Sequence, residues 1–187
     1  MKLYIKNMVS TSCKVVVQSE LENLGLHVTK VELGEAEIQE NISDSQLAQI
    51  RTIFKKFSFE LLNDKKSVLV EKIKNAIIEL VRYSDEPVKI NYSNYLSDKL
   101  KYNYNYLANR FSEVQGTTIE KHIISHKIER VKELLAYDEL NLTEIAHKLN
   151  YSSVSHLSNQ FKKTTGLTPS RYKEFGHGQR ISLDSLR

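Results

Sequence analysis

The sequence lacks the features that mark disulfide-bonded, secreted and membrane-spanning proteins. One cysteine among 187 residues cannot form an internal disulfide. No apolar run of the signal-peptide type precedes the first charged residues at the N-terminus. No window approaches the ~20 apolar residues that cross a bilayer. We therefore expect a cytoplasmic protein with no membrane partner.

Motifs for catalysis and cofactor binding are also missing. The sequence has no glycine loop that would cradle phosphate, no nucleophile elbow and no paired carboxylates. His122, His126 and His147 lack a cysteine or carboxylate cluster at metal-ligand spacing, although His122 and His126, one helical turn apart, could hold a stray divalent ion. We expect neither an enzyme nor a bound cofactor.

Positive charge is concentrated in the C-terminal half of the chain. Residues 1–86 contain 12 Lys and Arg against 13 Asp and Glu, whereas residues 87–187 contain 15 against 10. This excess favours binding of a polyanion by the C-terminal half, although many domains with no such function reach it.

A helix, a tight turn and a second helix are predicted between Asn141 and Phe175. Thr143 is expected to cap the first helix, whose apolar residues recur at helical spacing. Asn150 ends it, because asparagine tolerates the left-handed conformation that reverses a chain. Ser152 or Ser153 then caps the second helix. Its expected buried residues are Val154 or Leu157, Phe161 and the aliphatic part of Lys162.

A rougher copy of this pattern begins at Asn91. A helix to Leu100, a turn at Lys101-Tyr102 and a second helix capped by Asn103 are expected. Aligning the two turns places Leu107 near Leu157, Phe111 on Phe161, and Gly116 on Gly166, with Val114 as a further buried residue.

A long helix is predicted between the two copies, from Thr117 or Thr118 to about Tyr137. About twenty residues at 1.5 Å each give roughly 30 Å. That length is close to the ~34 Å of one turn of B-DNA. One chain would then present two helices to successive major grooves.

The C-terminal copy also carries a specific residue signature. It consists of Ile145-Ala146, Asn150-Tyr151, Ser155, Leu157, Phe161-Lys162-Lys163, Gly166, Thr168-Pro169 and Tyr172-Lys173. These residues resemble the DNA-binding domain of the AraC family of bacterial transcription regulators. Asn150 replaces the family's glycine and Leu157 its aromatic residue. The resemblance implies an all-α domain with two helix-turn-helix units that binds double-stranded DNA and regulates transcription.

The resemblance also implies which residues touch DNA. The positions that read bases are Asn105, Ala108, Asn109, Ser155, His156, Ser158 and Asn159. The positions that bind phosphates are Arg110, Lys162, Lys163, Arg171 and Lys173. Many relatives have arginine where this chain has Asn109 and Asn159, which implies a different sequence preference. Without the surrounding motif, Lys162-Lys163 would be interpreted as a solvated helix end.

The N-terminal part alternates strand and helix patterns. The expected elements are a strand at 2–8, a helix at 12–24, strands at 26–33 and 35–40 around Gly34, a helix from Ser43 or Asp44, and a strand at 57–62. Among the expected apolar positions of the first helix is Val15. This order is typical of a ferredoxin-like α+β fold.

This N-terminal part is similar to the heavy-metal-associated domains of copper chaperones. Those domains bind Cu(I) through M-x-C-x-x-C, because two thiolates on one loop suit a soft ion. Here Met8, Ser10 and Cys13 occupy the corresponding positions, and a serine hydroxyl is a poor ligand for Cu(I). A Cu(I) carrier or sensor using Met8 and Cys13 is therefore the alternative function. The other interpretation of Cys13 is a small residue near a helix start with no role.

Four segments are expected in all. They are an N-terminal domain at 1–63, a connecting helix and linker at 64–86 with Pro87 as the boundary, the DNA-binding domain at 87–176, and a tail at 177–187. Besides duplex DNA, the resemblance allows RNA polymerase as a partner, and the N-terminal domain allows a homodimer.

Overall fold

The computed structural model describes residues 1–83 and 91–175. The chain divides into two compact units, residues 1–75 and the part from Ala76 onward. The expected boundary at Pro87, the linker residues 84–86 and the tail at 177–187 lie outside the described residues. Within residues 1–83 and 91–175, no helix combines the length and apolarity that crossing a membrane requires.

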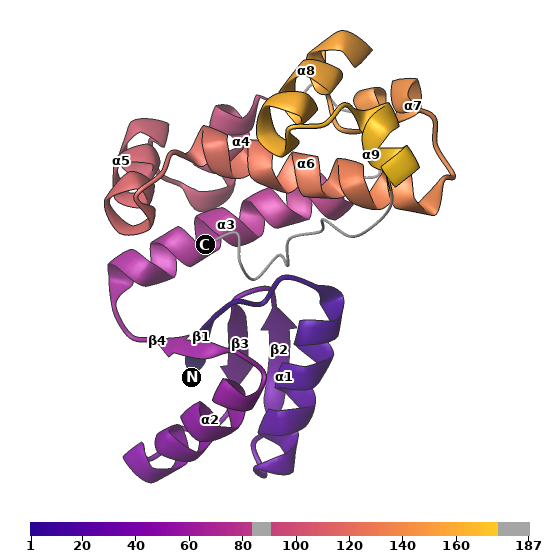
Figure 1. The fold of residues 1–187 in the computed structure, drawn as a ribbon. Helices are drawn as coiled ribbons and strands as arrows, with labels where there is room; N and C mark the ends of the chain where they lie inside the picture. The colour runs from indigo at the N-terminus through magenta and orange to yellow at the C-terminus, as the bar shows by residue number, and fades with distance from the viewer. Residues whose placement is uncertain (84–90, 176–187) are drawn as a thin grey trace. The chain divides into compact units, whose positions relative to one another are not determined.

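The first unit contains a small sheet of four antiparallel strands (Figure 1). Its elements are β1 (Lys2–Lys6), α1 (Thr11–Asn23), β2 (Val28–Glu32), β3 (Glu35–Ile38), α2 (Asp44–Lys56) and β4 (Glu60–Leu62). The strand order is β2-β3-β1-β4. The last strand is shorter than expected, because Phe57 caps the C-terminus of α2 and Ser58 adopts the left-handed conformation (φ 61°).

Alternation along β1 gives the first unit its core. Leu3 and Ile5 are buried, whereas the residues between them are more exposed. The other buried residues are Ala36, Ile38 and Leu61 from the sheet, Val17 and Leu21 from α1, and Ile50 and Phe54 from α2. Val15 lies in the predicted helix, but it is 65% exposed. Ser43, one of the two predicted caps, caps α2 and forms a capping box with Gln46.

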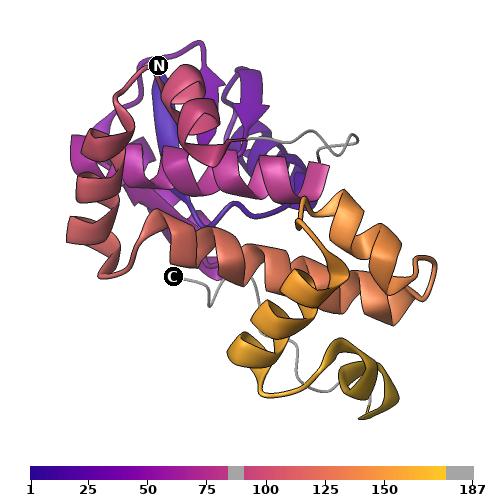
Figure 2. The same ribbon diagram turned by 90° about the horizontal axis from the view of Figure 1, so that it is seen from above.

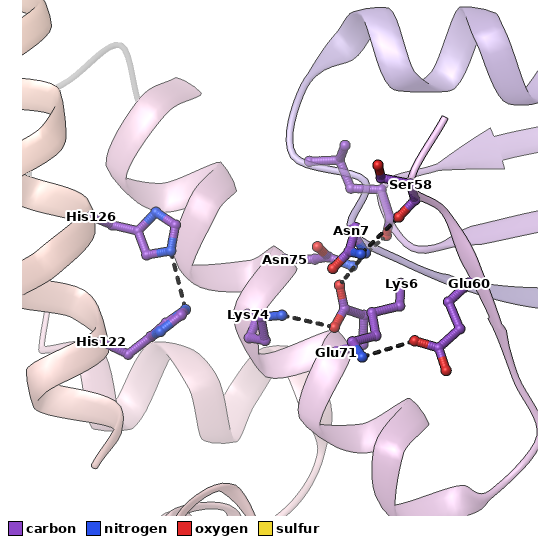
Figure 3. Close-up of polar contacts among 10 residues, drawn as sticks. Lys6, Asn7, Ser58, Glu60, Glu71, Lys74, Asn75, His122 and His126 are labelled. Atoms are coloured by element: carbon purple, nitrogen blue, oxygen red, sulfur yellow. Dashed lines mark hydrogen bonds and ion pairs between the residues drawn. The ribbon is translucent and has the colours of Figure 1, made fainter. Parts of the chain in front are cut away.

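The helix α3 (Lys65–Tyr83) begins in the first unit and is fixed there by polar contacts (Figure 3). The backbone amide of Asn7 donates to Glu71 Oε1 at 3.1 Å, and Asn7 Nδ2 donates to the carbonyl of Ser58 at 2.8 Å. Asn75 Nδ2 donates to the carbonyl of Leu33 at 3.0 Å. The turn between β2 and β3 therefore contacts α3 directly.

The described residues of the second unit contain the C-terminal part of α3 and further helices, and no strand. Its further helices are α4 (Tyr92–Leu100), α5 (Tyr104–Gln115), α6 (Ile119–Tyr137), α7 (Leu142–Lys148), α8 (Val154–Thr165) and α9 (Pro169–Phe175). In Figure 2, α4 and α5 lie toward one end of α6, α7 and α9 lie toward the other, and α8 lies beside its middle. Arg82 of α3 forms an ion pair with Glu133 of α6, which also binds Arg130 at 2.9 Å.

The two helix pairs α4–α5 and α7–α8 share their turn geometry, as the internal repeat predicted. Lys101 (φ 60°) and Asn150 (φ 55°) both adopt the left-handed conformation between the two helices of a pair. Gly116 (φ 65°) and Gly166 (φ 81°) end the second helix of each pair. Glycine adopts this conformation without a Cβ penalty, so it closes both helices at low cost.

Some local predictions in this unit were wrong. Asn141, not Thr143, caps α7, and its side chain forms a capping box with Glu144. Val114 is 40% exposed, because it lies on the outer side of α5 near the helix end. Lys162, whose aliphatic part was expected to be buried, is exposed. The predictions for Asn103, Thr118 and Ser153 as caps were confirmed.

Candidate nucleic-acid interface

The helices α5 and α8 are anchored by equivalent buried pairs. Leu107 and Phe111 of α5 are fully buried, as are Leu157 and Phe161 of α8. Each pair spans one helical turn, so it fixes the rotation of its helix about the helix axis. The opposite face of each helix is consequently turned away from the core.

The residues predicted to read bases lie on these outer faces. The exposed ones are Asn105, Asn109, Ser155, His156 and Asn159, and the partly exposed ones are Ala108 and Ser158. The side chain of Asn103 accepts a hydrogen bond from the amide of Asn105 at 2.9 Å. Ser153 likewise accepts from the amide of His156 at 3.0 Å. Both helices thus start with a fixed first turn.

One side of α6 brings the starts of the two helices together. A pocket there is lined by Ile123, Ile124 and Lys127 of α6, by Tyr104 at the start of α5, and by His156 of α8. Since α5 and α8 reach the same pocket, both lie on one side of α6. The 19 residues of α6 span about 28 Å.

The predicted phosphate ligands differ in their availability. Lys162, Lys163 and Arg171 are exposed, and no ion pair to them is found among the described residues. Arg110 binds Glu113 Oε2 at 2.7 Å and lies 5.3 Å from the ring centroid of Tyr106. Lys173 forms an ion pair with Asp138. Among the described residues, the predicted phosphate ligands without an ion pair therefore lie in α8 and α9, whereas Arg110 of α5 has a carboxylate partner.

The short helix α9 holds Arg171 beside α8. Tyr172 is buried and packs edge-to-face on Phe161, with ring centroids 5.4 Å apart. Thr168 Oγ1 accepts from the amide of Arg171 at 3.4 Å and so caps the first turn after Pro169. The position of Arg171 is thus set by packing of its neighbour on the second anchored helix.

The tyrosines at the start of α5 and just before it differ in exposure. Tyr104 is half-buried at the pocket. Tyr102 and Tyr106 are instead the exposed pair, with stacked rings 5.4 Å apart. Together with Arg110, this pair forms a flat, partly cationic surface next to the outer face of α5. The spacing of four residues between Tyr102 and Tyr106 is the signal that could have revealed it.

The candidate metal ligands do not form a cluster. Met8 is fully buried, and Cys13 is half-buried with its Sγ 3.3 Å from Ser10 Oγ. The Nε2 atoms of His122 and His126 lie 3.1 Å apart in the core of the second unit (Figure 3). In residues 1–83 and 91–175, no three or more His, Cys, Asp or Glu side chains are grouped as metal ligands.

The second unit is similar to proteins that bind DNA. A family described as "Helix-turn-helix domain" matches residues 96–174. This part of the chain is similar to helix-turn-helix domains. The match begins in α4 and ends in α9, so it includes both helix pairs and α6. Together with the relatives below, it supports the resemblance to the AraC family for this domain.

Three curated proteins share sequence similarity with the chain. The HTH-type transcriptional regulator YtdP of Bacillus subtilis is 27% identical over 158 residues, which cover 80% of this chain and 20% of that protein. AlkR of Acinetobacter baylyi, also an HTH-type transcriptional regulator, is 26% identical over 60% of this chain and 37% of its own length. The melibiose operon regulatory protein of Escherichia coli K12 is 26% identical over 46% of this chain and 29% of its own length. The chain thus spans between a fifth and about two fifths of these relatives.

A solved structure shares the fold. The C-terminal domain of AraT, a response regulator from Geobacillus stearothermophilus, aligns with a TM-score of 0.52 at 20% identity. The alignment covers 64% of this chain and 96% of that domain. At this identity, the likeness concerns the fold of the helical part alone.

Proposed function

We propose that this chain is the DNA-binding part of a transcriptional regulator of the AraC type. The observation that carries the proposal is the placement of α5 and α8. Both are anchored by buried pairs, expose polar faces and reach one side of α6. The helix α6 joins the two helix pairs and is about 28 Å long, close to one turn of B-DNA, which supports the proposal that α5 and α8 enter successive major grooves of one duplex.

Base readout is assigned to the outer faces of the two helices. Asn109 and Asn159 occupy equivalent places, two residues before the buried Phe111 and Phe161. An asparagine amide can donate to and accept from one adenine, which is worth about 1 to 3 kcal/mol of discrimination. The shorter side chains at Ala108, Ser155 and Ser158 allow close approach to base edges, and His156 lies beside them at the pocket.

Phosphate binding is assigned mainly to the second helix pair. Lys162, Lys163 and Arg171 are exposed and start from fixed positions at the end of α8 and in α9. Arg110 and Lys173 must exchange a carboxylate partner for a phosphate before they contribute. We therefore expect the C-terminal pair to supply most of the salt-dependent affinity.

The fold of the first unit supports a second part of the proposal. The order of elements is strand, helix, two strands, helix, strand, and the sheet order is β2-β3-β1-β4. We propose that this unit is a ferredoxin-like domain. RNA polymerase stays a predicted partner because of the resemblance. A homodimer formed through the N-terminal domain also stays a prediction.

The salt dependence of duplex binding tests the proposal. Fluorescence anisotropy with a labelled duplex should show affinity that falls steeply as salt concentration rises. Lys163→Ala should weaken binding to all sequences and reduce the slope of log affinity against log salt by about 1. Lys56→Ala removes the same charge from an exposed position in α2 and should leave the slope unchanged. Equal slopes for the two variants would contradict the assigned interface.

A further inference from the structure

The second unit contains a pocket that DNA reading does not explain. It has a volume of about 490 Å³ and lies between α4, α5, α6 and α8. Its aromatic and aliphatic lining residues are Tyr92, Tyr104, Ile123, Ile124 and Tyr151. Its polar and charged lining residues are Asn91, Ser93, Glu120, Lys127, His156 and Gln160. Pockets of this size and character hold small organic molecules.

A buried lysine lies in this pocket without a carboxylate partner. Lys127 is 7% exposed, and no ion pair to it is found in the parts of the chain that the structure describes. Its Nζ lies 3.9 Å from the ring centroid of Tyr151 and 3.5 Å from the carbonyl oxygen of Asn150. These weak contacts do not neutralise a buried ammonium group. Burial lowers the pKa of Lys127 to about 8, so the amine is still largely charged near neutral pH.

A second polar group in the pocket also lacks a partner. The hydroxyl of Tyr151 is buried, and no hydrogen bond to it is found among the described residues. Burial raises the pKa of this phenol, so it remains protonated and can donate. Buried polar groups in folded proteins are almost always hydrogen-bonded, so an unpaired hydroxyl beside an ammonium group that has no carboxylate partner among the described residues points to a missing acceptor.

The remaining groups limit the charge and the size of that acceptor. The start of α4 is at the pocket and adds the positive end of a helix dipole near Tyr92. Glu120 lies two turns of α6 away from Lys127 and also lines the pocket, which disfavours a second negative charge. A phosphate within a duplex is too bulky to reach the amine of Lys127, a residue that is only 7% exposed. A single carboxylate on an apolar body satisfies all these conditions.

We propose that this pocket binds a small monocarboxylate with an aromatic or aliphatic body. The carboxylate accepts hydrogen bonds from Lys127 and Tyr151, and the body lies against Tyr92, Tyr104 and the isoleucines of α6. The ligand would touch Tyr104 at the start of α5 and Gln160 of α8, so it would link the two helices. Coupling to DNA binding rests on the function proposed above, whereas ligand binding itself does not.

Methyl NMR of the full chain tests ligand binding directly. Isoleucine-labelled protein is titrated with 3-phenylpropionate, with octanoate, and with the neutral 3-phenylpropionamide as the matched control. One or both carboxylates should shift the methyl signals of Ile123 and Ile124 below about 10 mM, and the amide should bind at least about tenfold more weakly. No shift of these methyls by either carboxylate, or equal binding of the amide, would overturn the proposal.

Variants separate this site from nonspecific binding. Lys127→Met and Tyr151→Phe should each weaken carboxylate binding, Lys127→Met by at least about tenfold. Lys127→Met removes a buried charge without a carboxylate partner among the described residues, and Tyr151→Phe removes a buried hydroxyl without a hydrogen bond there. Both variants should therefore fold, which thermal melting checks. Lys121→Met removes a charge from an exposed position on the same helix and should bind as the wild type does. Unchanged binding by folded Lys127→Met would overturn the assignment.

A duplex-binding measurement with and without the carboxylate separates the two proposals. Methyl shifts together with a changed duplex affinity support both. Methyl shifts in a chain that binds no duplex would support the pocket and contradict the DNA-binding function. Duplex binding without methyl shifts would support the DNA-binding function and contradict the pocket.

Discussion

Replacing Lys127 by methionine should stabilise the protein at neutral pH, because it removes a buried charge. The unfolded lysine has a pKa of 10.5 and the folded one about 8. One pKa unit corresponds to about 1.4 kcal/mol. At a pH where Lys127 is charged in both the folded and the unfolded protein, its burial therefore destabilises the folded state by roughly 3 kcal/mol. Loss of the cation–π contact with Tyr151 offsets about 1 kcal/mol of the gain. A net increase of roughly 2 kcal/mol in the free energy of unfolding is expected.

The pH dependence identifies the cause. Between pH 8 and 10.5 the unfolded lysine keeps its proton while the folded lysine loses it. The unfolded state then binds more protons, so wild-type stability rises with pH through this range. The advantage of Lys127→Met is therefore full below about pH 8 and shrinks above it. The groups facing Lys127 are Tyr92 of α4 and Tyr151 after α7, with Glu120 and His156 at the pocket.

Urea unfolding followed by circular dichroism, at pH 7 and at pH 9.5, measures both effects. Lys121→Met is the control, because Lys121 is exposed on the same helix. The difference in free energy of unfolding between Lys121→Met and the wild type should be the same at pH 7 and at pH 9.5. A Lys127→Met protein that is less stable than wild type at pH 7, or whose advantage grows with pH, would refute this reasoning.

Two further substitutions test local features of the fold. Gly34→Ala should cost roughly 2 kcal/mol or more, because φ is +80° and the new Cβ would lie 2.1 Å from Asn75 Nδ2. Gly25→Ala has a similar φ of +77° but nothing within 4 Å, so chemical denaturation should show a smaller loss for it; equal losses would rule out the contact with Asn75. Asn141→Ala should cost about 1 kcal/mol by removing the cap of α7, while Thr143→Ala should cost less; the opposite order would contradict the cap assignment.

The sequence predicted the helical unit well because its signals are local. Left-handed turns at Lys101 and Asn150 and the glycine caps depend on one residue and its neighbours. The burial of Phe111 in α5 and of Phe161 in α8 follows from helical spacing. The cap of α7 was misplaced by two residues, since Asn141 and Thr143 both fit a cap and only backbone geometry distinguishes them.

The pocket could not be predicted, because its residues are far apart in the chain. Tyr92, Lys127 and Tyr151 come from three different segments and meet only after the helices pack. The repeat was misleading here as well. Tyr102 and Tyr151 align in the two turns, yet Tyr102 is 49% exposed and Tyr151 is 8% exposed. Burial at such positions depends on what lies against them, which the pattern does not contain.

Selection of bound duplexes from a randomised pool tests the central claim most directly. Wild-type protein should enrich a site of about 20 base pairs with two conserved clusters about one helical turn apart. Asn109→Ala should relax the preference in one cluster and Asn159→Ala in the other, because each residue belongs to a different anchored helix. A single cluster, or relaxation of the same cluster by both variants, would contradict two reading helices held on one side of α6.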